Sequence, residues 1–289
     1  MPASTPLRPL VDALEQTSAL DSIAKVVGKA VRDQLSGKPL KDAISGTWFG
    51  HAVHPPLTDV VIGSFLSASL LDLFGADDRA SERLVGIGLA AAIPTALTGV
   101  SDWADTEIAD DAVRRVGLVH ASANSSALLL YAASLAARRR GAHGRGALLS
   151  AAGTAVMAVG GYLGGHMSYV RGVGPNTTAF DPGPEDWTSL GKASTFKEDE
   201  PRAAVAGDTP VLILRRGATF FAIHNRCSHR GCLLSEGEVE GQVVTCACHG
   251  SQFDLADGSV IHGPATAAQP AFEARESEGR LEVRLRHRG

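Results

Sequence analysis

Cysteine is scarce in this chain: only four occur in 289 residues, and all four lie between residues 227 and 248. None is left to cross-link the rest of the chain, which excludes a disulfide-rich scaffold. The sequence also lacks a basic stripe, because its Lys and Arg residues are scattered among acids and its formal net charge is -4. Proteins that bind nucleic acid usually concentrate positive charge on one face. We therefore expect no nucleic-acid partner.

The start of the chain lacks the charged and then apolar run of a cleavable signal peptide. We therefore expect any membrane association to come from internal helices.

The composition also changes along the chain. Residues 84–170 are rich in Ala, Gly, Leu and Val, whereas residues 186–289 read as short strands separated by charged turns. This change predicts two domains of different class.

Three long stretches, residues 84–100, 116–137 and 147–170, are apolar and carry no acid, Lys or Arg. Lengths near 20 residues predict transmembrane helices. Residues 57–75 are also apolar but carry an acid near each end, and we infer a fourth membrane helix there from its three neighbours. The many Gly and Ala residues fit helices that approach closely in lipid, since a soluble core would use more Leu, Ile and Phe. The sequence thus predicts a four-helix transmembrane bundle.

Residues 9–35 place apolar side chains at the period of an amphipathic helix. Such a helix would lie on a membrane surface or pack on its own protein. The expected organisation is an amphipathic helical segment over residues 1–49, a four-helix transmembrane domain over 50–171, a Gly/Pro-punctuated linker over 172–185, and a small domain over 186–289.

Four crossings would bring several polar residues to one side of the membrane, which we call face A. It is defined by the starts of the first and third membrane helices and the ends of the second and fourth. Ionisable groups near membrane helices are costly and are by default functional candidates. We predict that two or three of His54, His120 and His166 bind a haem or a metal ion, with Asp102 as an outer partner. The alternative is that they hydrogen-bond one another, Asn124 or interfacial water.

Two short motifs in the last third of the chain carry cysteine and histidine. Cys227 and His229 lie in the first motif, and Cys246 and His249 lie in the second. Together they supply two thiolates and two imidazoles, the set that holds a [2Fe–2S] cluster with both histidines on one iron. The same set can bind a structural zinc ion. The ligand types alone leave both metal centres open.

Around these motifs the sequence reads as short strands separated by turns. The strand-like runs are residues 209–214, 219–224, 239–245, 259–262 and 281–285. This pattern favours a small antiparallel β domain with the two ligand loops at strand ends. The predicted fold class is therefore multi-domain: an all-α four-helix transmembrane bundle followed by a small all-β antiparallel domain.

Residues 186–289 resemble a Rieske [2Fe–2S] domain. Besides the two motifs, the shared residues are Phe253-Asp254, Asp257-Gly258 and Gly263-Pro264-Ala265, in the family's order. The resemblance favours iron–sulfur over zinc. It implies that Cys227 and Cys246 bind the buried iron and that His229 and His249 bind the outer one. Neutral imidazoles remove negative charge from such a cluster, and these centres span about −150 to +300 mV.

The resemblance also implies roles for neighbouring residues. Cys232 and Cys248 would form the disulfide that ties the loops together in Rieske subunits of quinol-oxidising cytochrome bc-type complexes and that ferredoxin-like members generally lack. The alternative is two reduced thiols, which cytosolic conditions would favour. Ser251 would donate a hydrogen bond toward a cluster sulfur, and Gly263 and Pro264 would lie beside the cluster.

The helical part is similar to a family of uncharacterised bacterial four-helix membrane proteins. The likeness covers residues 40–175 and rests on residues 50–59, 99–103 and 164–169. It supports the four-helix architecture and implies no activity.

Together these features predict a membrane-anchored electron-transfer component of the oxidoreductase type, without a substrate site of its own. It would carry single electrons between a quinol or haem partner and another redox protein, with membrane lipid around its helices. One alternative is a ferredoxin-like donor to a separate oxygenase, since the short stretch after His249 leaves no room for an oxygenase catalytic domain. Another is a non-redox membrane protein with a structural zinc site.

Charge distribution bears on the orientation. The loop between the third and fourth helices, opposite face A, carries Arg138, Arg139, Arg140 and Arg145. By the positive-inside rule this loop is cytoplasmic, which would put the cluster domain outside, where disulfides persist. The basic residues that oppose this reading lie on face A: Lys38, Lys41, Arg114, Arg115 and Arg171. We expect a multi-pass protein of the cell membrane with an extracytoplasmic cluster domain.

Phe253 stands where high-potential members of the family often carry a tyrosine whose hydroxyl donates toward the cluster. Such hydrogen bonds stabilise the reduced, more negative state. We therefore predict an intermediate reduction potential, which Phe253→Tyr should raise. A redox titration checks this, and a midpoint at or below the starting value would contradict it.

Overall fold

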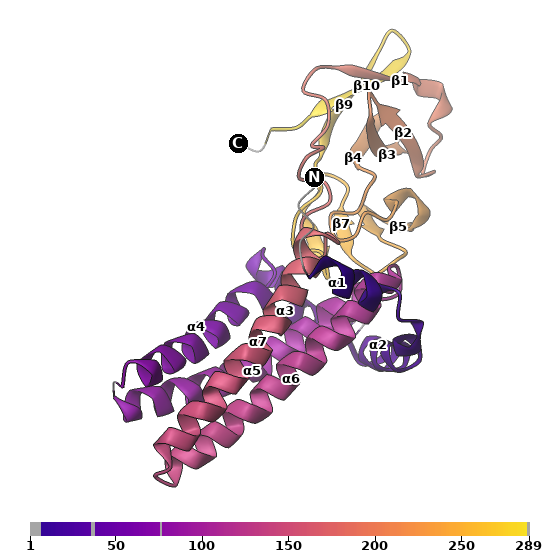
Figure 1. Cartoon of the computed structure of the whole chain (residues 1–289). Coiled ribbons are helices and arrows are strands. Elements are labelled where there is room, and N and C mark those ends of the chain that lie inside the picture. Colours follow the sequence, from indigo (N-terminus) through magenta and orange to yellow (C-terminus); the bar gives the residue numbers. More distant parts are fainter. Residues whose placement is uncertain (1–6, 36–37, 76, 288–289) are drawn as a thin grey trace, which may run out of the picture. The chain divides into compact units, whose positions relative to one another are not determined.

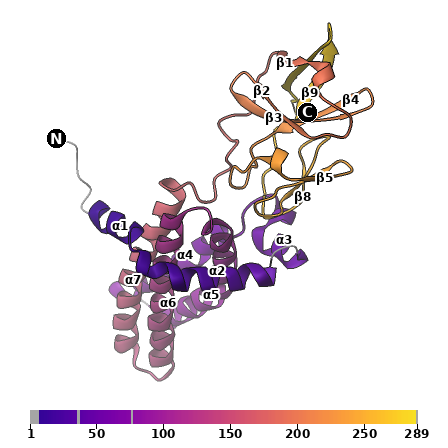
Figure 2. The same ribbon diagram turned by 90° about the vertical axis from the view of Figure 1, so that its right-hand side faces the viewer.

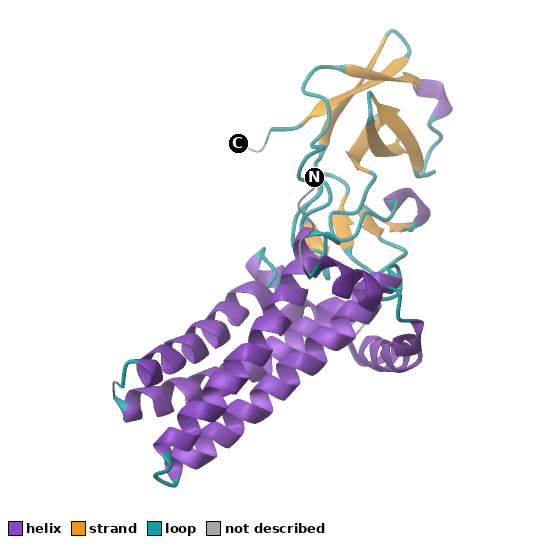
Figure 3. Ribbon diagram, viewed as in Figure 1, coloured by secondary structure: helices purple, strands orange, loops and turns teal. Residues whose placement is uncertain are grey.

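The computed structural model describes residues 7–35, 38–75 and 77–287. Long helices occupy the first part of the chain and strands occupy the last part (Figures 1 and 3). The described residues form two compact units. Unit 1 is the described part of Met1–Leu35 together with Val53–Val173, and unit 2 is the described part of Ser36–Ala52 together with Gly174–Gly289. Residues 38–52, which sequence reasoning grouped with the amino-terminal segment and the membrane domain, thus belong to the same unit as the β domain.

Four long helices pack side by side in unit 1 (Figures 1 and 2). They are α4 (His54–Leu73), α5 (Asp78–Thr106), α6 (Asp111–Arg139) and α7 (His143–Tyr169). Each is long and apolar enough to cross a membrane. Asp77 and Asp110 cap the starts of α5 and α6, because their side chains accept hydrogen bonds from backbone N–H groups of the first turn. The predicted four-helix bundle is confirmed, with helices longer than the uncharged stretches.

The bundle is held together by small residues, as α7 shows. Its buried positions recur every three or four residues, so they form one stripe along the helix. They are Gly146, Ser150, Gly153, Met157, Gly160, Leu163 and Met167. Small side chains at a helix contact let the backbones approach closely, as in membrane helix pairs.

The outward faces of the same helices are apolar. Large exposed apolar side chains on α4 to α7 include Val60, Ile62, Leu66, Leu70, Ile87, Ile93, Leu97, Leu129, Leu148 and Val159. A bundle in water would place polar side chains there, whereas a bundle in lipid exposes apolar ones. The outer surface therefore fits hydrocarbon.

The amino-terminal segment is two helices rather than the single one expected over residues 9–35. Helix α1 (Arg8–Glu15) and helix α2 (Asp21–Leu35) are separated by the 3₁₀ turn η1 (Ser18–Leu20). Polar residues with short side chains cause the break, because Thr17 donates its hydroxyl to the carbonyl of Ala13 and competes with helix continuation.

Ion pairs join these two helices to the bundle at face A. Glu107, just after α5, is completely buried, and Arg114 of α6 donates to it at 2.8 Å. Arg32 of α2 pairs with the same carboxylate. Arg115 of α6 donates to both carboxylate oxygens of Asp21, each at 2.8 Å. Buried charges are tolerated only when paired, so the amino-terminal helices are built into unit 1.

Unit 2 contains ten strands in three antiparallel sheets among its described residues. They are β1 (Thr188–Lys192), β2 (Arg202–Ala206), β3 (Thr209–Arg216), β4 (Thr219–His224), β5 (Glu238–Glu240), β6 (Val243–Thr245), β7 (Gln252–Asp254), β8 (Val260–His262), β9 (Phe272–Ser277) and β10 (Arg280–Leu285). The sheet orders are β1-β10-β9, β2-β3-β4 and β5-β6-β7-β8. Unit 2 also holds the short helix α3 (Pro39–Ser45) and the turns η2 (Thr47–Phe49), η3 (Ala193–Thr195) and η4 (Leu234–Glu236).

The predicted all-β fold is confirmed, with two differences in detail. The strands β1, β2, β7 and β9 lie outside the predicted runs. Residues 239–245, read as one strand, form the two strands β5 and β6, which pair with each other. The chain reverses at Gly241, whose φ of 56° lies in the left-handed region that glycine adopts without strain.

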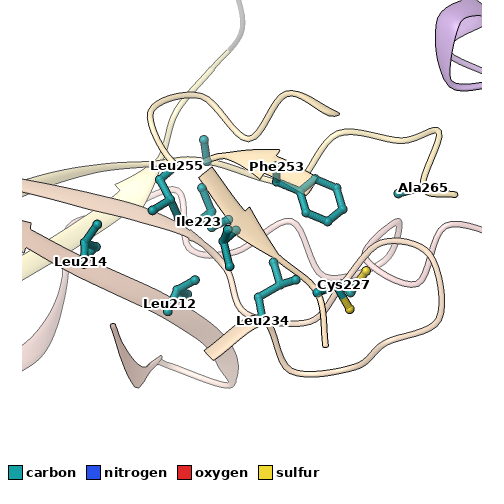
Figure 4. Packing of buried hydrophobic residues seen from close by; sticks show 11 residues of the cluster. Leu212, Leu214, Ile223, Cys227, Leu234, Phe253, Leu255 and Ala265 are labelled. Atoms are coloured by element: carbon teal, nitrogen blue, oxygen red, sulfur yellow. The ribbon is translucent and has the colours of Figure 1, made fainter. Parts of the chain in front are cut away.

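Two apolar cores fill unit 2. One lies between β9, β10, β3 and their neighbours, around Phe272 and Leu281. The other includes Leu212, Phe253 and the two cysteines Cys227 and Cys246 (Figure 4). The cysteines of the two motifs are therefore part of a hydrophobic core.

At the end of the bundle opposite face A, Arg138 is completely buried. Its guanidinium pairs with Asp72 of α4, with Nη1 to Oδ1 at 3.0 Å, and its Nε donates to Ser134 at 3.1 Å. One of the four arginines that the positive-inside argument counted is thus neutralised inside the protein.

We predict that Arg138→Ala lowers the free energy of unfolding in detergent by about 3–5 kcal/mol, because it leaves the carboxylate of Asp72 buried without its partner. The matched control is the adjacent, exposed Arg139→Ala, expected within about 0.5 kcal/mol of the wild type. Chemical unfolding followed by circular dichroism checks both variants. Equal effects would contradict the interpretation.

Candidate metal centre

The two cysteine–histidine motifs form loops of the same shape. The first follows β4, and the second connects β6 to β7. In the first, the N–H of Cys227 donates to Cys232 O and the N–H of Gly231 donates to Cys227 O, each at 2.8 Å. In the second, Cys246 N–H donates to Ser251 O at 2.8 Å and Gly250 N–H donates to Cys246 O at 2.9 Å. Each loop is therefore a closed turn with its first cysteine at the base.

The two basal cysteines meet inside the core. Cys227 and Cys246 are 1% and 2% exposed, and their side chains hydrogen-bond each other. This hydrogen bond lowers the pKa of Cys246 to about 6, although burial opposes the shift. It raises the pKa of Cys227, and burial acts in the same direction. The pair thus releases its first proton readily, which prepares a thiolate ligand.

The two histidines of the loops also meet. The rings of His229 and His249 are perpendicular, with centroids 5.0 Å apart, and both side chains are half-buried. Burial lowers the pKa of His229 well below its ordinary value, and His249 and Lys41 act in the same direction. A neutral imidazole is the form that binds a metal ion.

This donor set fits a [2Fe–2S] cluster. Two buried thiols that are not in a disulfide, Cys227 and Cys246, lie at the base of the loops. The rings of His229 and His249 lie two and three residues further along the same loops. Thiolates and neutral imidazoles are the ligands of Rieske-type centres.

A disulfide joins the two loops. Cys232 and Cys248 are bonded with an S–S distance of 2.02 Å. Together with Cys246, their sulfur atoms lie within 4.8 Å of one another. The disulfide expected from the family resemblance is therefore present, and it lies directly beside one of the basal cysteines.

Comparison with known proteins agrees with this geometry. Residues 186–273 match the family described as Rieske [2Fe-2S] domain. Over 100 residues the chain is 38% identical to the anthranilate 1,2-dioxygenase ferredoxin subunit of Burkholderia cepacia, which covers 35% of this chain and 93% of that protein. The chain belongs to the Rieske family. Residues 50–177 match a second family, described as Predicted membrane protein (DUF2231).

Two further relatives of the Rieske domain illustrate its range. Ferredoxin CarAc of Metapseudomonas resinovorans is 34% identical over 77 residues, which are 27% of this chain and 72% of that protein. The cytochrome b6-f complex iron-sulfur subunit of Chlorobaculum thiosulfatiphilum is 28% identical over 90 residues, which are 31% of this chain and 49% of that protein. The chain thus spans about half of the latter relative.

Of the residues expected beside the cluster, Ser251 lies in the second ligand loop, whereas Gly263 and Pro264 lie in a third loop that follows β8. Ser251 is completely buried, and its hydroxyl accepts a hydrogen bond from Ala265 N–H at 3.0 Å. Ala265 follows Gly263 and Pro264, so Ser251 joins the second ligand loop to the loop that contains both. Phe253 of β7 is completely buried in the core that holds Cys227 and Cys246 (Figure 4).

The expected linker makes contacts with the first ligand loop that the sequence did not indicate. Within residues 172–185, Thr177 donates its hydroxyl to Cys227 O at 2.7 Å and its backbone N–H to Ser228 O at 3.1 Å. Asp181 accepts a hydrogen bond from Thr209 at 2.6 Å. This stretch therefore supports the first ligand loop, and its Gly and Pro residues concealed that role.

The membrane histidines all have protein partners. His54 Nδ1 lies 3.0 Å from Thr95 O, and His120 Nδ1 lies 2.8 Å from Gly160 O. The amide nitrogen of Asn124 lies 3.2 Å from His120 Nε2. These contacts match the alternative considered for these residues, hydrogen bonding within the protein.

His166 has a partner that the sequence did not indicate. Its Nε2 lies 2.8 Å from Glu15 Oε1 of α1, and Arg171 Nε donates to the same oxygen at 2.8 Å. The hydrogen bond from Arg171 lowers the pKa of Glu15 below its ordinary value, and burial opposes the shift. Asp102 is half-buried near the end of α5. Haem or metal ligation by His54, His120, His166 and Asp102 stays a prediction.

We predict that the double variant Cys232→Ser and Cys248→Ser lowers the unfolding free energy of the Rieske domain by about 3 kcal/mol, because the bond closes a loop of this size in the unfolded chain. Denaturant unfolding under oxidising conditions measures the change. Reductant should shift the wild type in the same direction and leave the double variant unaffected. An unchanged transition in the double variant would contradict the prediction.

Proposed function

We propose that this protein is a membrane-anchored carrier of single electrons, with a [2Fe–2S] cluster held by Cys227, His229, Cys246 and His249. The observation that carries the proposal is that two buried thiols and two imidazoles, whose ring centroids lie 5.0 Å apart, occupy the same two loops in a domain of the Rieske family. When bound, such a cluster takes up and releases one electron at a time.

The residues around the site support this function in distinct ways. The hydrogen-bonded Cys227–Cys246 pair supplies thiolate ligands from inside the core, where apolar side chains keep water away. His229 and His249 are only half-buried, so they form the route by which an electron reaches the surface of the domain. The Cys232–Cys248 disulfide fixes the spacing of the two loops.

We propose that the electron passes between a quinol or haem partner and another redox protein. The disulfide supports this choice, because a pair at these positions resembles that of Rieske subunits in quinol-oxidising complexes. The resemblance to the cytochrome b6-f complex iron-sulfur subunit supports it as well. The four apolar helices would hold the protein in the membrane in which quinols dissolve.

A second candidate is a ferredoxin-like donor to a separate oxygenase. The relative that is 38% identical over 93% of its length is a dioxygenase ferredoxin subunit. The two candidates differ in the donor. A quinol-linked carrier accepts electrons from quinol, whereas a ferredoxin-like one needs a stronger reductant.

For the orientation, we propose an extracytoplasmic Rieske domain. Arg139, Arg140 and Arg145 in the loop between α6 and α7 support a cytoplasmic position for that loop. The disulfide supports an oxidising surrounding for the Rieske domain.

Purified protein in detergent should give a Rieske-type electron paramagnetic resonance signal on reduction. We expect Cys227→Ser, Cys246→Ser, His229→Ala and His249→Ala each to abolish it, because each removes a ligand. His287→Ala, at an exposed histidine near the carboxyl-terminal end, should retain it. A signal that is absent from the wild type would refute the proposal and favour zinc, which metal analysis detects.

The optical spectrum of the same sample tests the membrane histidines, because bound haem gives a strong visible band. A water-soluble quinol then separates the two electron-transfer candidates. Reduction of the cluster by the quinol is the expected result. Reduction by dithionite alone would favour the ferredoxin-like donor.

A further inference from the structure

A groove lies between α5 and α6 at the end of the bundle opposite face A. It has a volume of about 460 Å³, and residues of both helices line it. Three of these residues are charged and lie near the helix ends. Glu82 and Arg83 belong to the second turn of α5, and Arg139 is the last residue of α6. The groove lies within unit 1, so it is separate from the candidate metal centre.

The rest of the groove is apolar and extends along the helices away from the charged end. Its lining there consists of Gly86, Ile87 and Ala90 of α5 and Leu135 of α6. The seven residues from Arg83 to Ala90 extend about 10 Å along the helix axis, at ~1.5 Å per residue. A charged end followed by an apolar wall of this length matches the boundary between the headgroups and the acyl chains of a bilayer.

Gly86 leaves the floor of the groove open. Beyond its own helical turn, a Cβ atom added at Gly86 would meet no atom of the described residues within 4 Å. A Cβ atom added at Gly88 would lie 2.5 Å from the ring of Phe65. Packing inside the protein therefore explains Gly88 but not Gly86. Because glycine disfavours a helix, its presence usually has a packing or functional reason, which an occupant of the groove would supply.

The charges at the end of the groove favour an anion. Arg83 and Arg139 are exposed, and neither forms an ion pair with any side chain that the structure describes, whereas the neighbouring Arg138 is buried against Asp72. Glu82 is the one acid among the lining residues, so two arginines and one glutamate leave an excess of one positive charge. Guanidinium groups bind phosphate oxygens through pairs of parallel hydrogen bonds.

We propose that this groove is a binding site for one anionic phospholipid. The lipid phosphate lies between Arg83 and Arg139, and an acyl chain passes over Gly86 along the apolar wall. A free phosphate ion would fill only the charged end, whereas the apolar part needs a hydrocarbon chain. The excess positive charge selects a headgroup with a net negative charge, such as phosphatidylglycerol, over the zwitterionic phosphatidylcholine.

Native mass spectrometry of the full-length protein in detergent, mixed with equal amounts of phosphatidylglycerol and phosphatidylcholine, tests the proposal. We expect the protein to retain one phosphatidylglycerol in preference. Arg83→Gln and Arg139→Gln should each weaken its binding about fivefold, because a basic residue at a membrane surface contributes roughly this factor. Arg140→Gln is the matched control, since Arg140 is exposed and adjacent in the chain but does not line the groove.

A side chain placed in the groove tests the acyl chain separately. Gly86→Leu puts leucine into open space, so the variant should fold and should retain less phosphatidylglycerol than the wild type. Gly161→Leu in α7 is the control, because a Cβ atom there also meets nothing within 4 Å and Gly161 lies outside the groove. Circular dichroism and thermal unfolding in lipid-free detergent establish that each variant is folded.

Each part of the proposal can be overturned. Equal retention of the two lipids by the wild type would refute the preference for an anionic headgroup. Arginine variants that bind as well as Arg140→Gln would refute the position of the phosphate. Retention in Gly86→Leu equal to that in Gly161→Leu would refute the position of the acyl chain. Thermal stabilisation by inorganic phosphate alone, or a second copy of the chain in place of the lipid, would identify a different occupant and refute the lipid site.

Discussion

The buried thiols of Cys227 and Cys246 and the Cys232–Cys248 disulfide bring together two loops that belong to separate strands. Both cysteines belong to the hydrophobic core, so the metal centre and the core of this part of unit 2 form together. Each loop repeats the same backbone turn, and the Cys232–Cys248 disulfide ties the turns a short distance from the thiols. Loops closed by hydrogen bonds and a disulfide have few other conformations, so the backbone restricts where the four candidate ligands can lie.

Unit 1 carries ion pairs between buried side chains at both ends of its apolar bundle. At face A the carboxylate of Glu107 is buried against Arg114 and Arg32, and at the opposite end Arg138 is buried against Asp72. Helix α2 supplies Arg32, one of the two arginines that pair with Glu107. The basic residues at either end are therefore partly structural, which weakens any argument on orientation that counts them all as surface charge.

The sequence predicted those parts of the fold that depend on local pattern. Long uncharged stretches identified the four helices, and β4 was predicted at its observed bounds, Thr219–His224. The four candidate ligands were identified because two cysteines and two histidines stand in motifs that resemble the Rieske family, and their binding of a cluster stays a prediction. What could not be predicted depends on contacts between distant residues, such as His166 with Glu15, which are 151 residues apart, and Asp42 with His262. Hydrophobic periodicity also missed two breaks in regular structure, because each break depends on a single residue. The chain reverses at Gly241 between β5 and β6, and it leaves the helix near Thr17 between α1 and α2.

The division of the chain into units has a consequence for how such a protein can be taken apart. The chain changes from one unit to the other after Leu35, after Ala52 and again after Val173. A fragment that begins at Gly174 would contain all four cluster ligands but would lack the helix that carries Lys41 and Asp42. The described part of unit 2 therefore comes from two stretches of the chain, residues 38–52 and 174–287, which flank all four long helices α4 to α7. Truncation at residue 174 would separate the four candidate ligands from the first of these stretches.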